Sequence, residues 1–80
     1  MPLPTKKELM ISGVSTVAEC YGMELSDDDV NLLLQIPYIQ KAAEKDAEIH
    51  LEWGRNHDND LSNCEIPHDN LFHVFGVLFN

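Results

Sequence analysis

The chain has 80 residues, of which 44% are hydrophobic, and its 14 acidic and 5 basic residues give a net charge of -9 at pH 7. This length and composition predict one globular domain with a small core. The charge excludes direct binding to nucleic acid or to anionic membranes, because we expect no basic patch to form from so few cations. It favours cationic partners instead. The basic residues are Lys6, Lys7, Lys41, Lys45 and Arg55.

The cysteines and the N-terminus indicate where the protein resides. Cys20 and Cys64 lie far apart and form no Cys-x-x-Cys pair. Two free thiols in a cytoplasmic protein are therefore expected, with one disulfide as the alternative. The N-terminal lysines are not followed by a long apolar run, so we expect no signal peptide, and no stretch is apolar for long enough to span a bilayer.

The first predicted element is a helix over residues 6–21. Thr5 and Glu8 have the spacing of a capping box, and Gly22 is a natural residue to end the helix. Apolar residues recur at the spacing of one helical face. They are Met10, Val14, Val17, Ala18 and Tyr21.

A second helix is predicted over residues 27–36. Ser26 is a favourable N-cap, and the three aspartates that follow it suit the positive end of the helix dipole. Pro37 should stop or kink this helix, because proline lacks an N–H and crowds the preceding turn. Apolar residues near the end of the helix predict burial on more than one face. They are Leu32, Leu33, Leu34 and Ile36.

A third helix is predicted over residues 38–53, with Gly54 as its stop. We expect Trp53 in the core, because it shares a helical face with Ile49. The other apolar residues of this helix are Ile39, Ala42 and Ala43. Its remaining positions carry charges that we expect at the surface, including Glu44, Asp46, Glu48 and Glu52.

A fourth helix over residues 69–79 is favoured, capped by Asp69 or Asn70. Its apolar face would contain Leu71, Phe72, Phe75, Leu78 and Phe79. The content of valine and phenylalanine would also suit a buried strand, which remains the alternative. The sequence as a whole predicts an all-α fold, a small bundle of three to four short helices.

The polar segment HDNDLSNCEIPHDN, residues 57–70, is the best candidate for a metal site. An EF-hand loop that starts at Asp58 has oxygen ligands at several of the required positions, but Glu65 stands where an apolar residue is needed and Pro67 disturbs the returning end. A zinc site would lack the short ligand spacing that identifies such sites. The zinc donors would be His57, Cys64, His68 and His73.

We therefore favour a turn-rich loop for residues 57–70, with no bound metal and no cofactor. The metal-binding alternative retains Asp58, Asp60, Ser62, Cys64, His68 and Asp69. His50 and His73 stand alone on predicted helices. Cys20 is expected to be buried and inert, whereas Cys64 has His57 or His68 nearby but no third group to orient such a pair. With no phosphate-binding loop either, we do not expect an enzyme.

The acidic surface is the remaining functional signal. A solvated, solubilising face is the simplest interpretation of such charges. The functional interpretation is an inhibitor or adaptor that docks carboxylates on a basic site of a larger protein, such as one that normally holds nucleic acid. Small acidic helical proteins of this kind occur among phage-encoded anti-CRISPR proteins and among bacteriocin immunity proteins, an analogy of size and charge only. The candidate contact residues are Glu24, Asp27, Asp28, Asp29, Glu44, Glu48, Glu52, Asp58 and Asp60.

Two alternatives to the inhibitor or adaptor belong to other classes. One is a helical domain that binds calcium or zinc through residues 57–73. The other is a structural subunit that dimerises through residues 71–79, because five large apolar residues near the C-terminus are many for so small a core.

Overall fold

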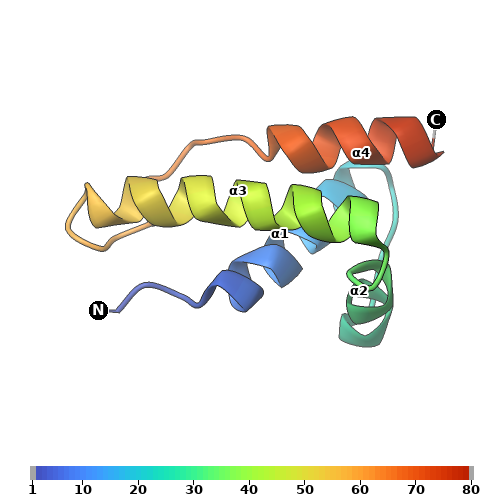
Figure 1. Cartoon of the computed structure of the whole chain (residues 1–80), viewed down its shortest axis with the longest axis horizontal. Helices are drawn as coiled ribbons and strands as arrows, with labels where there is room; N and C mark the ends of the chain where they lie inside the picture. The colour runs from blue at the N-terminus through green and yellow to red at the C-terminus, as the bar shows by residue number, and fades with distance from the viewer. Residues whose placement is uncertain (1, 80) are drawn as a thin grey trace.

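A computed structural model describes residues 2–79 and folds them into a small bundle of four helices (Figure 1). The helices are α1 (Lys6–Cys20), α2 (Asp27–Leu33), α3 (Pro37–Arg55) and α4 (Asp69–Phe79). α1 and α4 both pack on α3, whereas α2 packs on α1. In Figure 1, α4 runs antiparallel to α3 and returns the chain to the end of the bundle where α3 begins. The predicted all-α fold is confirmed, and residues 71–79 are helical rather than a strand.

α1 begins and ends close to the predicted residues because its caps are local. Thr5 Oγ1 accepts a hydrogen bond from the Glu8 N–H at 3.1 Å, and the Glu8 carboxylate accepts one from the Thr5 N–H at 3.1 Å. Hydrogen bonds to the Glu8 carboxylate from the Thr5 N–H and from the Thr5 side chain lower the pKa of Glu8. At the other end Gly22 adopts a φ of 76°, and the Met23 N–H donates to the Ala18 carbonyl at 2.9 Å. This is the Schellman arrangement that glycine favours.

α2 is shorter than predicted. Its capping box is present, with the Ser26 hydroxyl accepting from the Asp29 N–H at 3.2 Å. The helix ends at Leu33, and Pro37 is the first residue of α3, so the proline separates two helices rather than kinking one. The predicted burial on more than one face is wrong, because Leu32 is 61% exposed and Ile36 is exposed as well.

The core lies between α1, α3 and α4, and α2 adds Val30 to it. Its buried apolar residues are Val14, Val17, Ala18, Val30, Leu34, Ile39, Ala42, Ala43, Leu71, Val74 and Phe75. The predicted face of α1 is confirmed, with Met10 and Tyr21 packed at its margins. The predicted face of α3 is partly wrong, because Ile49 is exposed and Trp53 is only partly buried. Ala47 and Leu51 are buried on this helix instead.

Gly54 lies inside α3 and does not end it. A Cβ atom at this position would stand 2.7 Å from Leu3 Cδ2 and 2.9 Å from Leu61 Cδ2, so the glycine makes room for the segments that cross the helix. The helix continues to Arg55, and the chain turns at Asp58 and Asn59, whose φ values are 57° and 55°. Asparagine and aspartate enter this left-handed region more easily than most residues, which explains how the turn forms without glycine.

α4 is capped by a residue of α3. Asp46 is only 2% exposed. Its Oδ1 accepts from the Asn70 N–H at 3.2 Å and from Asn70 Nδ2 at 2.8 Å, and its Oδ2 accepts from the Leu71 N–H at 2.9 Å. The predicted cap at Asp69 or Asn70 and the predicted exposure of Asp46 are therefore both wrong. The physical reason is that the first N–H groups of a helix need acceptors, and a carboxylate from a neighbouring helix can supply them.

Candidate functional site

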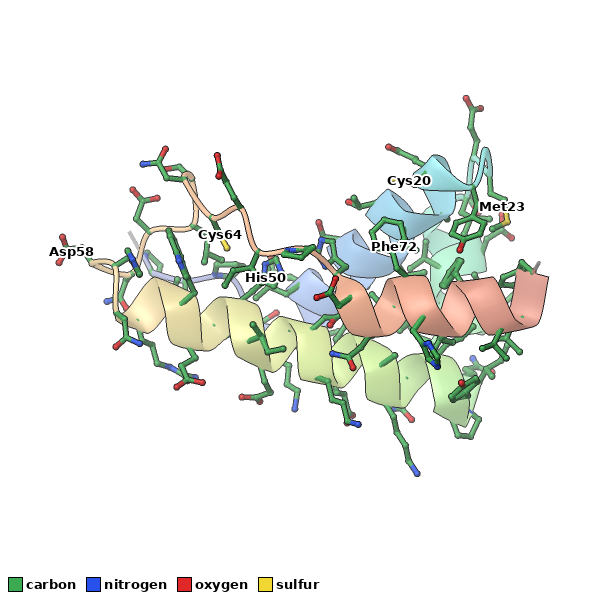
Figure 2. The ribbon with its side chains drawn as sticks, turned by 90° about the horizontal axis from the view of Figure 1, so that it is seen from above. Cys20, Met23, His50, Asp58, Cys64 and Phe72 are labelled. Atoms are coloured by element: carbon green, nitrogen blue, oxygen red, sulfur yellow. The ribbon has the colours of Figure 1, made fainter. Side chains whose placement is uncertain are left out.

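The carboxylates predicted from the sequence to form one partner-binding surface lie in three separate parts of the structure. Glu24 and Asp27–Asp29 lie on and just before the first turn of α2, at the end of the bundle where α4 also ends (Figure 1). Asp58 and Asp60 lie on the loop after α3, at the opposite end, and Figure 2 shows Asp58 projecting outward there. Glu44, Glu48 and Glu52 lie on α3 between the two. The structure does not join them into one acidic surface.

The middle group lies on a face of mixed charge. Lys6 Nζ is 3.1 Å from the Glu48 carboxylate, and both line a hollow of about 450 Å³ on the outer side of α3. The other residues of this hollow are Lys41, Glu44, Lys45, Ile49 and Asn70. Several lysines therefore do converge, contrary to the sequence-based expectation, but glutamates stand among them. The carboxylates and ammonium groups of this hollow therefore compensate each other in part.

The end of the bundle near α2 also exposes large apolar side chains, and we call these residues the apolar end. They are Ile36 (40% exposed), Tyr38 (44%), Val77 (57%), Leu78 (44%) and Phe79 (46%). They belong to the N-cap and first turn of α3 and to the last turn of α4, which lie at the same end of the bundle in Figure 1. Tyr38 lines a groove between these helices together with Val74, which lies one turn before Leu78.

The predicted apolar face of the fourth helix is therefore correct only in its first half. Leu71 and Phe75 are buried and Phe72 is partly buried against the core, but Leu78 and Phe79 are exposed. Figure 1 shows the last turn of α4 extending beyond the start of α3, so this turn has no neighbouring helix to cover it.

The polar segment 57–70 forms turns. The Asp60 carboxylate accepts from the Ser62 N–H at 2.9 Å, which lowers the pKa of Asp60. The His57 ring stacks on Trp53 with ring centroids 3.8 Å apart, and His73 lies elsewhere, in the groove between α3 and α4. Within residues 2–79, no three or more side chains of His, Cys, Asp or Glu are placed to hold a metal ion. Neither the EF-hand set nor the zinc set is assembled.

Cys64 instead lies beside a histidine that the sequence analysis expected to stand alone on a helix. Cys64 Sγ lies 3.8 Å from Nδ1 of His50, a residue of α3 that precedes the cysteine by 14 positions. The His50 ring stacks on His68, with centroids 4.7 Å apart and planes inclined by only 8°. In Figure 2 the Cys64 sulfur points inward toward His50. Cys20 is exposed, so its predicted burial is wrong, and neither cysteine forms a disulfide.

These side chains line a small polar cavity of about 190 Å³ between α1, α3 and the 57–68 loop. His50 Nε2 and His68 Nδ1 are buried and have no hydrogen-bond partner. Burial of the imidazole lowers the pKa of His68, the proximity of His50 lowers it further, and the Asp46 carboxylate partly opposes both effects. The complete lining is Leu9, Ser12, Asp46, Ala47, His50, Leu61, Cys64 and His68.

Comparisons with known proteins do not assign the chain to a group. No protein family, curated protein or solved structure matches the chain. No helix in the described part of the chain has the length and apolar character needed to cross a membrane.

Proposed function

We propose that the chain is a protein–protein interaction module, a small acidic inhibitor or adaptor that docks on a basic site of a larger protein. The observation that carries this proposal is the apolar end, where large side chains remain between 40% and 57% exposed in a protein of only 80 residues. Exposed apolar side chains that cluster in one place on a small protein are typical of interaction sites.

The charge of the same end selects the kind of partner. Glu24, Asp27 and Asp28 accept no hydrogen bond from another described side chain and pair with no described cation, so their charge remains available. An apolar centre with a charged rim is the usual anatomy of a protein interface. Unpaired carboxylates at this end of the bundle attract a surface rich in lysine or arginine, speed its capture and disfavour acidic partners.

The net charge of -9 also favours a basic partner over a second copy of the chain. Two copies that met through their apolar ends would bring two chains of charge -9 together, and like charges oppose association. A basic site on another protein meets no such penalty. Occupation of that site would block other ligands sterically, including any nucleic acid that uses it.

A retention experiment with matched variants tests this function. The immobilised protein is incubated with an extract of its source cells at low salt, beside Val77→Ser/Leu78→Ser and beside Ile49→Ser. Ile49 is the control because it is exposed to the same extent as Leu78, 44%, but belongs to the mixed-charge face. We expect a basic protein to be retained by the wild type and by Ile49→Ser, and to be lost from Val77→Ser/Leu78→Ser and in high salt.

Three results would contradict the proposal. The first is that no protein is retained. The second is that retention is equal in all variants and unaffected by salt. The third is a homodimer in native mass spectrometry that Val77→Ser/Leu78→Ser dissociates, which would assign the apolar end to self-association.

A further inference from the structure

The cavity beneath the 57–68 loop contains a thiol in contact with a base. Cys64 Sγ and His50 Nδ1 are 3.8 Å apart, within the range of a weak hydrogen bond to sulfur. Two different elements supply the pair, since His50 is on α3 and Cys64 is on the loop. The stacked ring of His68 contacts His50 and limits its rotation. The imidazole is therefore held beside the sulfur by the fold.

Two further observations describe the surroundings of the pair. His50 Nε2 and His68 Nδ1 are buried and have no protein partner, so both nitrogens can still bind water or a small polar group. The cavity volume of about 190 Å³ leaves space beside the sulfur for a small group. Asp46, four residues before His50 on α3, places a negative charge on the cavity wall, which favours a cation within it.

We propose that Cys64 is a modification site that forms mixed disulfides with low-molecular-weight disulfides, and that His50 is the base that takes up the thiol proton. The proton moves from Cys64 Sγ to His50 Nδ1. The resulting thiolate attacks one sulfur of the small disulfide, a new sulfur–sulfur bond forms to Cys64, and the other half leaves as a thiolate that takes a proton from solvent. No external oxidant is needed, because the small disulfide is itself reduced.

We attribute the reactivity of Cys64 to the base that the fold places beside it, and not to solvent exposure of the thiol. A free thiol is only a few per cent thiolate at neutral pH, so a positioned base can accelerate its attack by about tenfold. Cys20 is the internal reference, because it is exposed and has no histidine or other described side chain as a hydrogen-bond partner. The site is separate from the apolar end, and the proposal does not depend on the function proposed above.

The test uses the full chain with cystamine, a small cationic disulfide, at pH 7. The rate of adduct formation at each cysteine is followed by peptide mass mapping, once with the folded protein and once in urea. We expect Cys64 to react about tenfold faster folded than unfolded, and Cys20 to change by less than about twofold. His50→Gln, checked for helix content by circular dichroism, should bring the folded rate at Cys64 down to the urea rate or below.

Two results would overturn the proposal. If folded Cys64 reacts no faster than in urea, the thiol is merely shielded and inert. If the acceleration persists in folded His50→Gln, His50 is not its cause. The comparison of folded and unfolded wild type needs no variant, so it decides the first point even if His50→Gln fails to fold.

Discussion

Replacing Asp46 with alanine tests whether the buried carboxylate holds α4 on α3. The substitution leaves the N–H groups of Asn70 and Leu71 and the Asn70 side-chain amide without their acceptor. A hydrogen bond to a charged group contributes about 1.5–3 kcal/mol, and loss of a helix N-cap costs about 0.5–2 kcal/mol. Because these contributions overlap, we expect the free energy of unfolding to fall by about 3 kcal/mol.

That loss is large for this chain. An 80-residue domain has a total stability of about 4–12 kcal/mol, and for its size each kcal/mol corresponds to about 4–8 °C in Tm. Asp46→Ala should therefore lower the Tm by about 12–24 °C. Asp46→Asn should lose less, because its amide oxygen can still accept from Asn70 while its NH₂ group faces the Leu71 N–H.

Urea and thermal unfolding followed by circular dichroism measure these changes. Glu52→Gln is the matched control, because it removes one negative charge from an exposed position on the same helix and should stay within about 0.5 kcal/mol of the wild type. The reasoning is refuted if Asp46→Ala costs less than about 1 kcal/mol, or no more than Glu52→Gln.

Three further predictions concern pH, the α1–α2 turn and metal ions. The pKa of His68 in the folded protein is lower than its usual 6.5, so the unfolded state binds more protons below that pH. The contribution of His68 to stability should be complete above about pH 6.5 and decline as the pH falls through that value. His68→Gln should remove this pH dependence from unfolding free energies measured between pH 5 and 8. The lowered pKa values of Glu8 and Asp60 act at more acidic pH and do not interfere. Gly22→Ala should cost about 1 kcal/mol in urea unfolding because the φ of 76° strains a Cβ, and Gly22→Asn should cost less; equal stabilities would contradict this. Prior chelation should leave the Tm unchanged, and a lower Tm would restore the metal-binding alternative.

The features that sequence reasoning predicted correctly depend on residues close together in the chain. The capping boxes at Thr5 and Ser26 each join residues three positions apart, and Gly22 ends α1 through its own φ. The cap of α4 was missed because its acceptor, Asp46, lies 24 residues before Asn70. No local pattern identifies a charged residue on a helix as the cap of another helix.

The errors at the candidate site also arise from contacts between residues far apart in the chain. The contact between His50 and Cys64 exists because the 57–68 loop folds back along α3, and neither residue lies in a spacing that indicates the pair. The predicted face of α3 was correct at Ile39, Ala42 and Ala43 but continued to Ile49, whereas the buried stripe continues through Ala47 and Leu51. The mixed-charge face likewise depends on Lys6 reaching Glu48 from another helix.

The buried contacts of α4 and its proposed binding surface lie at opposite ends of the helix. Its first turn is fixed by the buried Asp46 carboxylate and by Leu71, whereas its last turn extends beyond the start of α3 with Val77 and Leu78 exposed. A helix held at one end by buried polar contacts can present apolar side chains at the other end without losing its position. Substitutions at Val77 and Leu78 should therefore change partner retention and leave the Tm nearly unaltered. Asp46→Asn should do the reverse, provided that retention is measured well below its Tm. If the two effects cannot be separated in this way, the last turn of α4 belongs to the folding core, and the apolar end is not an independent binding surface.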